Sequence, residues 1–71
     1  MSENFKEKFC DRLRELRTES RLLQKDVAEK LQIPVSTYSN WEQGRTEPSI
    51  NDIYRLLMIF EVDANTLFDM N

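Results

Sequence analysis

Glycine is almost absent from this chain, and that scarcity restricts the possible folds more than any other feature. Gly44 is the single glycine among 71 residues, and Pro34 and Pro48 are the two prolines. Both residue types fall far below their usual share, which favours an all-helical chain. A chain of this length makes one domain whose core supplies little net stability, so a partner subunit would help.

Apolar residues recur at helical spacing and predict five helices. The first three cover about residues 5–18, 24–31 and 35 to 42 or 43, and the last two lie between about 49 and 68. Gly44 is placed to end the third helix, Ser49 to cap the fourth with Asp52, and Asp63 to cap the fifth. We therefore expect a single compact all-α domain over residues 1–71, with a helix-turn-helix at about 24–43.

Further expectations concern the second and fourth helices. Leu23 stands where a Ser, Thr or Asn cap is usual, so the second helix should lack a side-chain cap. Gln24 would then present a free polar end at a helix N-terminus, a position suited to a phosphate. The fourth helix should bury an apolar stripe formed by Ile50, Ile53, Leu56, Leu57 and Phe60.

The third predicted helix has two unlike faces. At about 100° per residue, one face takes Val35, Tyr38, Trp41 and Glu42. The other carries only small polar side chains, namely Ser36, Ser39, Asn40 and Gln43, with Thr37 at its flank. Exposed helix faces usually favour Glu, Lys and Arg, because Ser and Asn are poorer helix formers. A short helix of this kind fits the DNA major groove, where Asn and Ser can meet base edges.

The groups that most enzymes rely on are missing. The chain has no histidine, and Cys10 is its single cysteine. A zinc site and a conventional thiol–base pair are therefore excluded. One glycine cannot form a phosphate-cradling loop, and the many carboxylates are best explained as solvated helix surface. We expect no enzymatic activity, no metal, no cofactor and no small-molecule ligand.

The charge and the cysteine content of the chain indicate its binding partners and its cellular compartment. The net charge of −3 argues against a nucleic-acid binder, for which a basic domain is usual. The acidity is uneven, however, because residues 1–45 hold nine Lys/Arg and eight Asp/Glu, whereas residues 46–71 hold Arg55 and five acids. Cys10 cannot form an internal disulfide, and no apolar run approaches membrane-spanning length. We expect a cytoplasmic protein with no membrane partner.

Three short motifs occur at fixed places: QKDVA at residues 24–28, YSNWEQGR at 38–45 and EPS at 47–49. In combination they resemble the Cro/cI-type (XRE-family) helix-turn-helix, and the resemblance extends over about residues 9–68. It implies a five-helix, lambda-repressor-like fold. It also implies a sequence-specific DNA-binding transcriptional regulator, often a homodimer on a palindromic operator in double-stranded DNA.

The resemblance also implies roles for individual residues. The base-reading positions are principally Val35, Ser36 and Asn40, with Thr37 and Ser39 as further candidates. The DNA-backbone positions are Gln24, Lys25, Gln43, Arg45 and Thr46. Arg17 and Glu42 match a partly buried ion pair that links the first helix to the end of the third.

The chain departs from the family pattern at two turns. Gln32 and Arg21 stand where glycine is frequent. If the backbone at Gln32 is left-handed, its side chain costs on the order of 1 kcal/mol. Arg21 could double as a phosphate contact.

Two hypotheses about the binding partner remain open. A homodimer would use apolar residues of the last two helices, for which Met58, Ile59, Val62 and Met70 are the candidates. The alternative is a protein-interaction module on the same fold, of the antitoxin or anti-repressor type. The acidic C-terminal third and the shortage of Lys and Arg around the third helix support that alternative.

Overall fold

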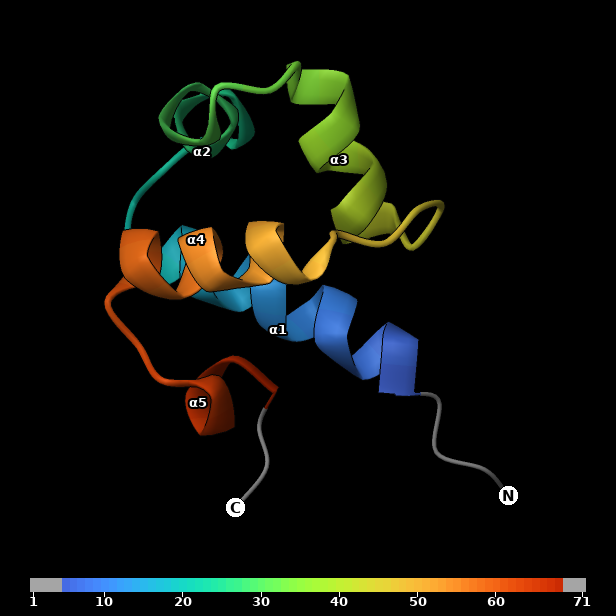
Figure 1. Cartoon of the computed structure of the whole chain (residues 1–71), viewed down its shortest axis with the longest axis vertical. Helices are drawn as coiled ribbons and strands as arrows, with labels where there is room; N and C mark the ends of the chain where they lie inside the picture. Colours follow the sequence, from blue (N-terminus) through green and yellow to red (C-terminus); the bar gives the residue numbers. More distant parts are fainter. Residues whose placement is uncertain (1–4, 69–71) are drawn as a thin grey trace.

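Five helices account for the described part of the chain, residues 5–68 of a computed structural model (Figure 1). They are α1 (Phe5–Glu19), α2 (Gln24–Leu31), α3 (Val35–Gln43), α4 (Ile50–Phe60) and α5 (Ala64–Phe68). The bounds of the first three lie within one residue of the prediction, and the all-helical fold class is confirmed. Over these residues, no helix is both long and apolar enough to span a membrane.

The helices surround one core. In Figure 1, α2 and α3 lie at one end of the molecule, α1 and α4 cross its middle, and α5 lies at the other end. α2 packs on α3 and α4, while α1 packs on α3 and α5. The buried core cluster takes residues from every helix: Phe9, Leu13, Leu16, Val27, Ala28, Leu31, Tyr38, Trp41, Leu56, Phe60 and Leu67. This packing holds α3 by one face and leaves its other face to solvent.

Side-chain caps begin α4 and α5 as predicted. Ser49 Oγ accepts the Asp52 backbone N–H at 3.1 Å, and Asp52 Oδ2 accepts the Ser49 N–H at 3.0 Å. Asp63 accepts a backbone N–H of α5 at 2.9 Å, and this bond holds the pKa of its carboxyl below the ordinary value. The Leu23 side chain makes no cap, also as predicted, but Asp26 accepts the Leu23 backbone N–H at 2.8 Å. The start of α2 therefore has a side-chain hydrogen bond to its backbone that was not predicted.

The buried stripe of α4 is narrower than predicted. Leu56 and Phe60 are buried, and Ile53 and Leu57 pack half-buried against the core. The prediction was wrong for Ile50, which is 85% exposed. Six residues at about 100° each place Ile50 roughly 120° around the helix from Leu56, so its side chain points away from the core.

Left-handed backbone ends three of the helices. Gln32 after α2 has a φ of 61°, Gly44 after α3 has 78°, and Glu61 after α4 has 56°. Arg21, in the link between α1 and α2, also has a φ of 61°. Glycine adopts this conformation freely, whereas other side chains crowd the following carbonyl oxygen. The left-handed turn considered for Gln32 is thus present.

The Gln32→Gly variant is expected to raise the free energy of unfolding by up to about 1 kcal/mol, because Gln32 is exposed and its conformation is strained. Urea unfolding followed by circular dichroism measures the change. Lys30→Gly, two residues earlier within α2, is the matched control and should lower stability by about 1 kcal/mol. Loss of stability in both variants would contradict the strain at Gln32.

Candidate nucleic-acid interface

Buried side chains fix α3 along one face. Tyr38 is fully buried, and Trp41 and Glu42 are each 3% exposed. The rings of Tyr38 and Trp41 meet edge to face with centroids 5.8 Å apart, a favoured arrangement for aromatic pairs. Pro34 precedes the helix with a φ of −63°, and left-handed Gly44 ends it. The helix therefore cannot turn about its axis without breaking this packing.

The Glu42 carboxylate joins three helices. Arg17 of α1 donates from Nε to Oε2 at 2.7 Å and from Nη2 to Oε1 at 3.3 Å. Tyr38 of α3 donates its hydroxyl to Oε2 at 2.5 Å, and Gln24 of α2 donates Nε2 to Oε1 at 3.0 Å. The ion pair that the resemblance implied is therefore present. Tyr38 and Gln24 complete what we call the Glu42 network.

Charges in the Glu42 network compensate one another. Burial alone would raise the pKa of Glu42, but the hydrogen bonds from Arg17, Tyr38 and Gln24 outweigh it and lower the pKa below its ordinary 4.5. The hydrogen bond to Glu42 raises the pKa of Arg17. Burial raises the pKa of Tyr38, so its hydroxyl stays protonated and can donate. Within residues 5–68, no buried side-chain nitrogen or oxygen lacks a partner.

Gln24 differs from the sequence-based expectation. It was expected to present a free polar end, but its amide nitrogen donates to Glu42 and the side chain is half-buried. The reason is tertiary: α3 places a buried carboxylate beside the start of α2, within hydrogen-bond distance of the Gln24 amide. One N–H and the carbonyl oxygen of the carboxamide have no bond within the Glu42 network.

The opposite face of α3 is uncharged and accessible. Val35 was expected beside Tyr38 and Trp41 on the inward face, but it is 46% exposed. Ser36 is exposed, and Thr37, Ser39 and Asn40 are half-buried. Gln43 is exposed and donates Nε2 to Ser39 Oγ at 2.9 Å. Glu42 is the single charged residue of α3, and it points inward. The structure thus brings the five proposed base-reading residues onto one helix.

The other residues that the resemblance assigns to the DNA backbone lie outside α3. Lys25 in α2 and Arg45 and Thr46 after α3 are all exposed. The Arg45 backbone N–H donates to the Asn40 carbonyl at 2.9 Å, which fixes the chain as it leaves the helix. Arg45 and Thr46 follow α3 within three residues of its end, and Lys25 is the second residue of α2, the helix that packs on α3.

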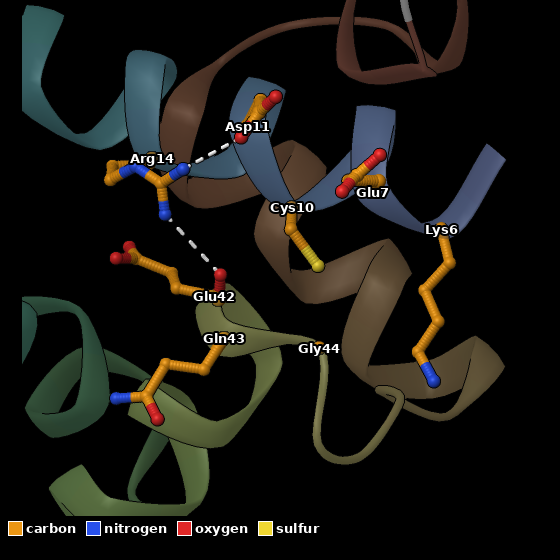
Figure 2. A pocket seen from close by; sticks show the side chains of 8 residues that line it. All are labelled: Lys6, Glu7, Cys10, Asp11, Arg14, Glu42, Gln43 and Gly44. Atoms are coloured by element: carbon orange, nitrogen blue, oxygen red, sulfur yellow. Dashed lines mark hydrogen bonds and ion pairs between the residues drawn. The ribbon is translucent and has the colours of Figure 1, made fainter. Parts of the chain in front are cut away.

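A polar pocket beside the end of α3 has no surplus of positive charge that could bind an anion. Figure 2 shows it between the first half of α1 and the segment Glu42–Gly44. Arg14 donates to the Glu42 carbonyl at 3.3 Å and to Asp11 at 2.7 Å. The Cys10 thiol donates to a backbone oxygen of α3 at 3.1 Å, and burial raises its pKa. Cys10 therefore acts here as a packing residue and a weak donor.

The comparisons with known proteins agree with this geometry. The family model described as Helix-turn-helix matches residues 13–67. The chain belongs to the Cro/cI-type (XRE) helix-turn-helix family. No solved structure matches it.

Two curated relatives also carry the family name. The HTH-type transcriptional regulator DdrOP3 of Deinococcus deserti is 40% identical over 62 residues, which cover 87% of this chain and 48% of that protein. The uncharacterized HTH-type transcriptional regulator YobD of Bacillus subtilis is 27% identical over 62 residues, covering 87% of this chain and 55% of that protein. This helix-turn-helix chain thus spans about half the length of the curated relatives it matches.

The residues proposed for a dimer contact of this XRE-family chain are not equally accessible. Met58 is 62% exposed, whereas Ile59 and Val62 are half-buried against the core. Met70 lies outside the described residues. Ile50 and Tyr54 are exposed as well, four residues apart and eight and four residues before Met58. Among residues 5–68, no cluster of His, Cys, Asp and Glu could hold a metal ion.

The Glu42→Gln variant should lose roughly 3–5 kcal/mol of stability near neutral pH, because Arg17 would face no counter-charge in a half-buried site. The folded-state pKa of Glu42 lies below 4.5, so the carboxylate stabilises the fold fully above that pH and less as pH falls further. Urea unfolding at a series of pH values should show wild type and variant converging in acid.

Glu29→Gln on the exposed side of α2 is the matched control, and its effect should stay within about 0.5 kcal/mol. A stability difference between wild type and Glu42→Gln that stays constant down to acidic pH would refute the stabilising role of the ionised carboxylate.

Proposed function

We propose that this chain is a DNA-binding transcriptional regulator that reads a palindromic operator as a homodimer, with α3 in the major groove. The observation that carries the proposal is that α3 has two unlike faces. Tyr38, Trp41 and Glu42 hold one face, and short uncharged side chains occupy the other. The names of both curated relatives, HTH-type transcriptional regulators, support the same function.

Base reading is assigned to the outward residues of α3. Asn40 is suited to paired hydrogen bonds with adenine, and Ser36 can meet several bases. Val35 offers an apolar contact suited to a thymine methyl group. Thr37 and Ser39 lie beside them and complete the proposed reading surface.

Backbone anchoring is assigned to the residues that border α3. Lys25, Arg45 and Thr46 are exposed, and Gln43 needs only to exchange its bond with Ser39 for one to a phosphate. The second N–H of Gln24 and the free backbone N–H groups at the start of α2 offer further donors. Because few of these groups are cations, we expect a modest salt dependence of binding.

Asn40→Ala should relax base preference at one position of each half-site, by roughly 1–3 kcal/mol, since a paired hydrogen bond to a base edge is lost. Binding to a panel of single-base operator variants measures the preference. Asn51→Ala, on the exposed side of α4, is the matched control and should leave the preference unchanged. Equal base discrimination by wild type and Asn40→Ala would refute the base-reading role.

Arg45→Ala should weaken binding to all DNA sequences and reduce the slope of affinity against salt by about one unit, because one phosphate contact is lost. Titrations at several salt concentrations measure both effects. Lys8→Ala, an exposed cation of α1 outside the proposed contacts, controls for net charge. An unchanged salt slope for Arg45→Ala would remove Arg45 from the backbone contacts.

Selection from randomised duplex DNA is the direct test of the proposed function. An enriched palindrome would support operator binding and would report the half-site spacing. No enriched sequence would favour the alternative of a protein-interaction module, for which the acidic segment 46–71 is the supporting observation.

A further inference from the structure

Gln24 stands at the start of α2 and contacts the buried side of α3. Its Nε2 donates to Glu42 Oε1 at 3.0 Å. Glu42 is 3% exposed, whereas Gln24 is half-buried. One side of the Gln24 carboxamide therefore meets a buried carboxylate, while part of the side chain remains accessible at the first turn of α2.

The charge of Glu42 decides which way round the Gln24 carboxamide lies. A glutamine has an NH₂ group that donates and a carbonyl oxygen that accepts, and half a turn of the carboxamide exchanges them. An ionised carboxylate only accepts, so the NH₂ group must face Glu42. The other hydrogen bond to Oε1, from Arg17 Nη2, is longer at 3.3 Å. Gln24 therefore supplies the shorter of the two hydrogen bonds that this oxygen receives.

We propose that Glu42 is a positioning residue for DNA binding, which holds Gln24 so that its second N–H is presented to a phosphate of the DNA backbone. This inference rests on the proposed function, in which Gln24 is one of the backbone donors. The two N–H bonds of an amide diverge, so the one that does not meet Glu42 points away from the carboxylate. It lies at the first turn of α2, where backbone N–H groups without a helical partner also favour an anion.

Holding Gln24 before DNA arrives favours binding. Glutamine is a long, flexible side chain, and ordering such a side chain during binding costs affinity. The hydrogen bond to Glu42 fixes the carboxamide in advance. Gln43 is a contrasting case, because it is exposed and its partner is the hydroxyl of Ser39, which can both donate and accept. Ser39 therefore does not select one orientation of the Gln43 carboxamide.

The proposed phosphate contact of Gln24 is uncharged. Arg17 donates twice to Glu42 and also donates Nη1 to the Leu22 carbonyl at 2.9 Å, so its guanidinium is engaged inside the protein. The phosphate would meet only the neutral amide of Gln24. A neutral donor displaces no cation from DNA, so this contact should add affinity without adding to the salt dependence. In that respect Gln24 differs from Arg45.

Gln24→Met tests the phosphate contact, because methionine has a similar length and no N–H. Affinity for randomised duplex DNA should fall about tenfold, the effect of one hydrogen bond to a charged group, while the slope of affinity against salt stays that of wild type. Asn51→Ala, which removes an exposed amide from α4, is the matched control and should bind like wild type. Circular dichroism checks that both variants are folded.

Nuclear magnetic resonance of the wild-type protein tests the positioning itself, because the two hydrogens on Gln24 Nε2 give separate signals. Without DNA, the hydrogen that meets Glu42 should exchange with solvent at least about tenfold more slowly than the other. Its signal should also shift as Glu42, whose pKa lies below 4.5, takes up a proton in acid. Added duplex DNA should slow and shift only the second hydrogen. The Nε2 hydrogens of Gln43 are the internal control and should not follow the acid titration.

The possible failures are distinguishable. Equal exchange of the two Gln24 hydrogens in the DNA-free protein would overturn the positioning role of Glu42, even in a protein that binds DNA. Binding of Gln24→Met as tight as that of wild type would remove the phosphate contact and leave the proposed function standing, because the DNA selection reports operator binding separately. A wild-type protein that binds no duplex DNA would refute the proposed function and the phosphate contact together.

Discussion

The buried carboxylate of Glu42 is the interaction on which the arrangement of α3 depends. It receives hydrogen bonds from Arg17 in α1, Gln24 in α2 and Tyr38 in α3, so one group ties together the three helices that position the proposed reading surface. A buried charge is costly unless it is paired and hydrogen-bonded, and all of these bonds are made here. Any rotation of α3 that exposed a different face would leave both Glu42 and Arg17 without their charged partner.

The same network explains how an acidic chain keeps the outward face of α3, proposed to read DNA, free of charge. Glu42 is the one charged residue of α3, and the paired guanidinium of Arg17 compensates it inside the protein. The outward face is left neutral, and the cations Lys25, in α2, and Arg45, just after α3, are exposed. Specificity would then come from neutral base contacts, with a small number of backbone contacts and a second copy of the chain supplying the remaining affinity.

Much of the fold could be predicted because its signals are local. Helical spacing, the Ser49 cap and the single glycine at the end of α3 placed the helix bounds to within a residue or two. The Arg17–Glu42 pair needed the family resemblance, since the partners are 25 positions apart. The bond from Gln24 to Glu42 was missed because it forms only when the start of α2 meets the end of α3.

The sequence by itself determined which residues share a helix face, because the angle between successive residues in a helix is constant. It also determined that α3 would present small polar side chains opposite Tyr38 and Trp41. Only the tertiary structure decided which apolar residues of α4 are buried. Ile50 was expected in the core and lies outside it, because the neighbouring helices pack on the side of Leu56 and Ile50 stands roughly 120° around the helix from that side.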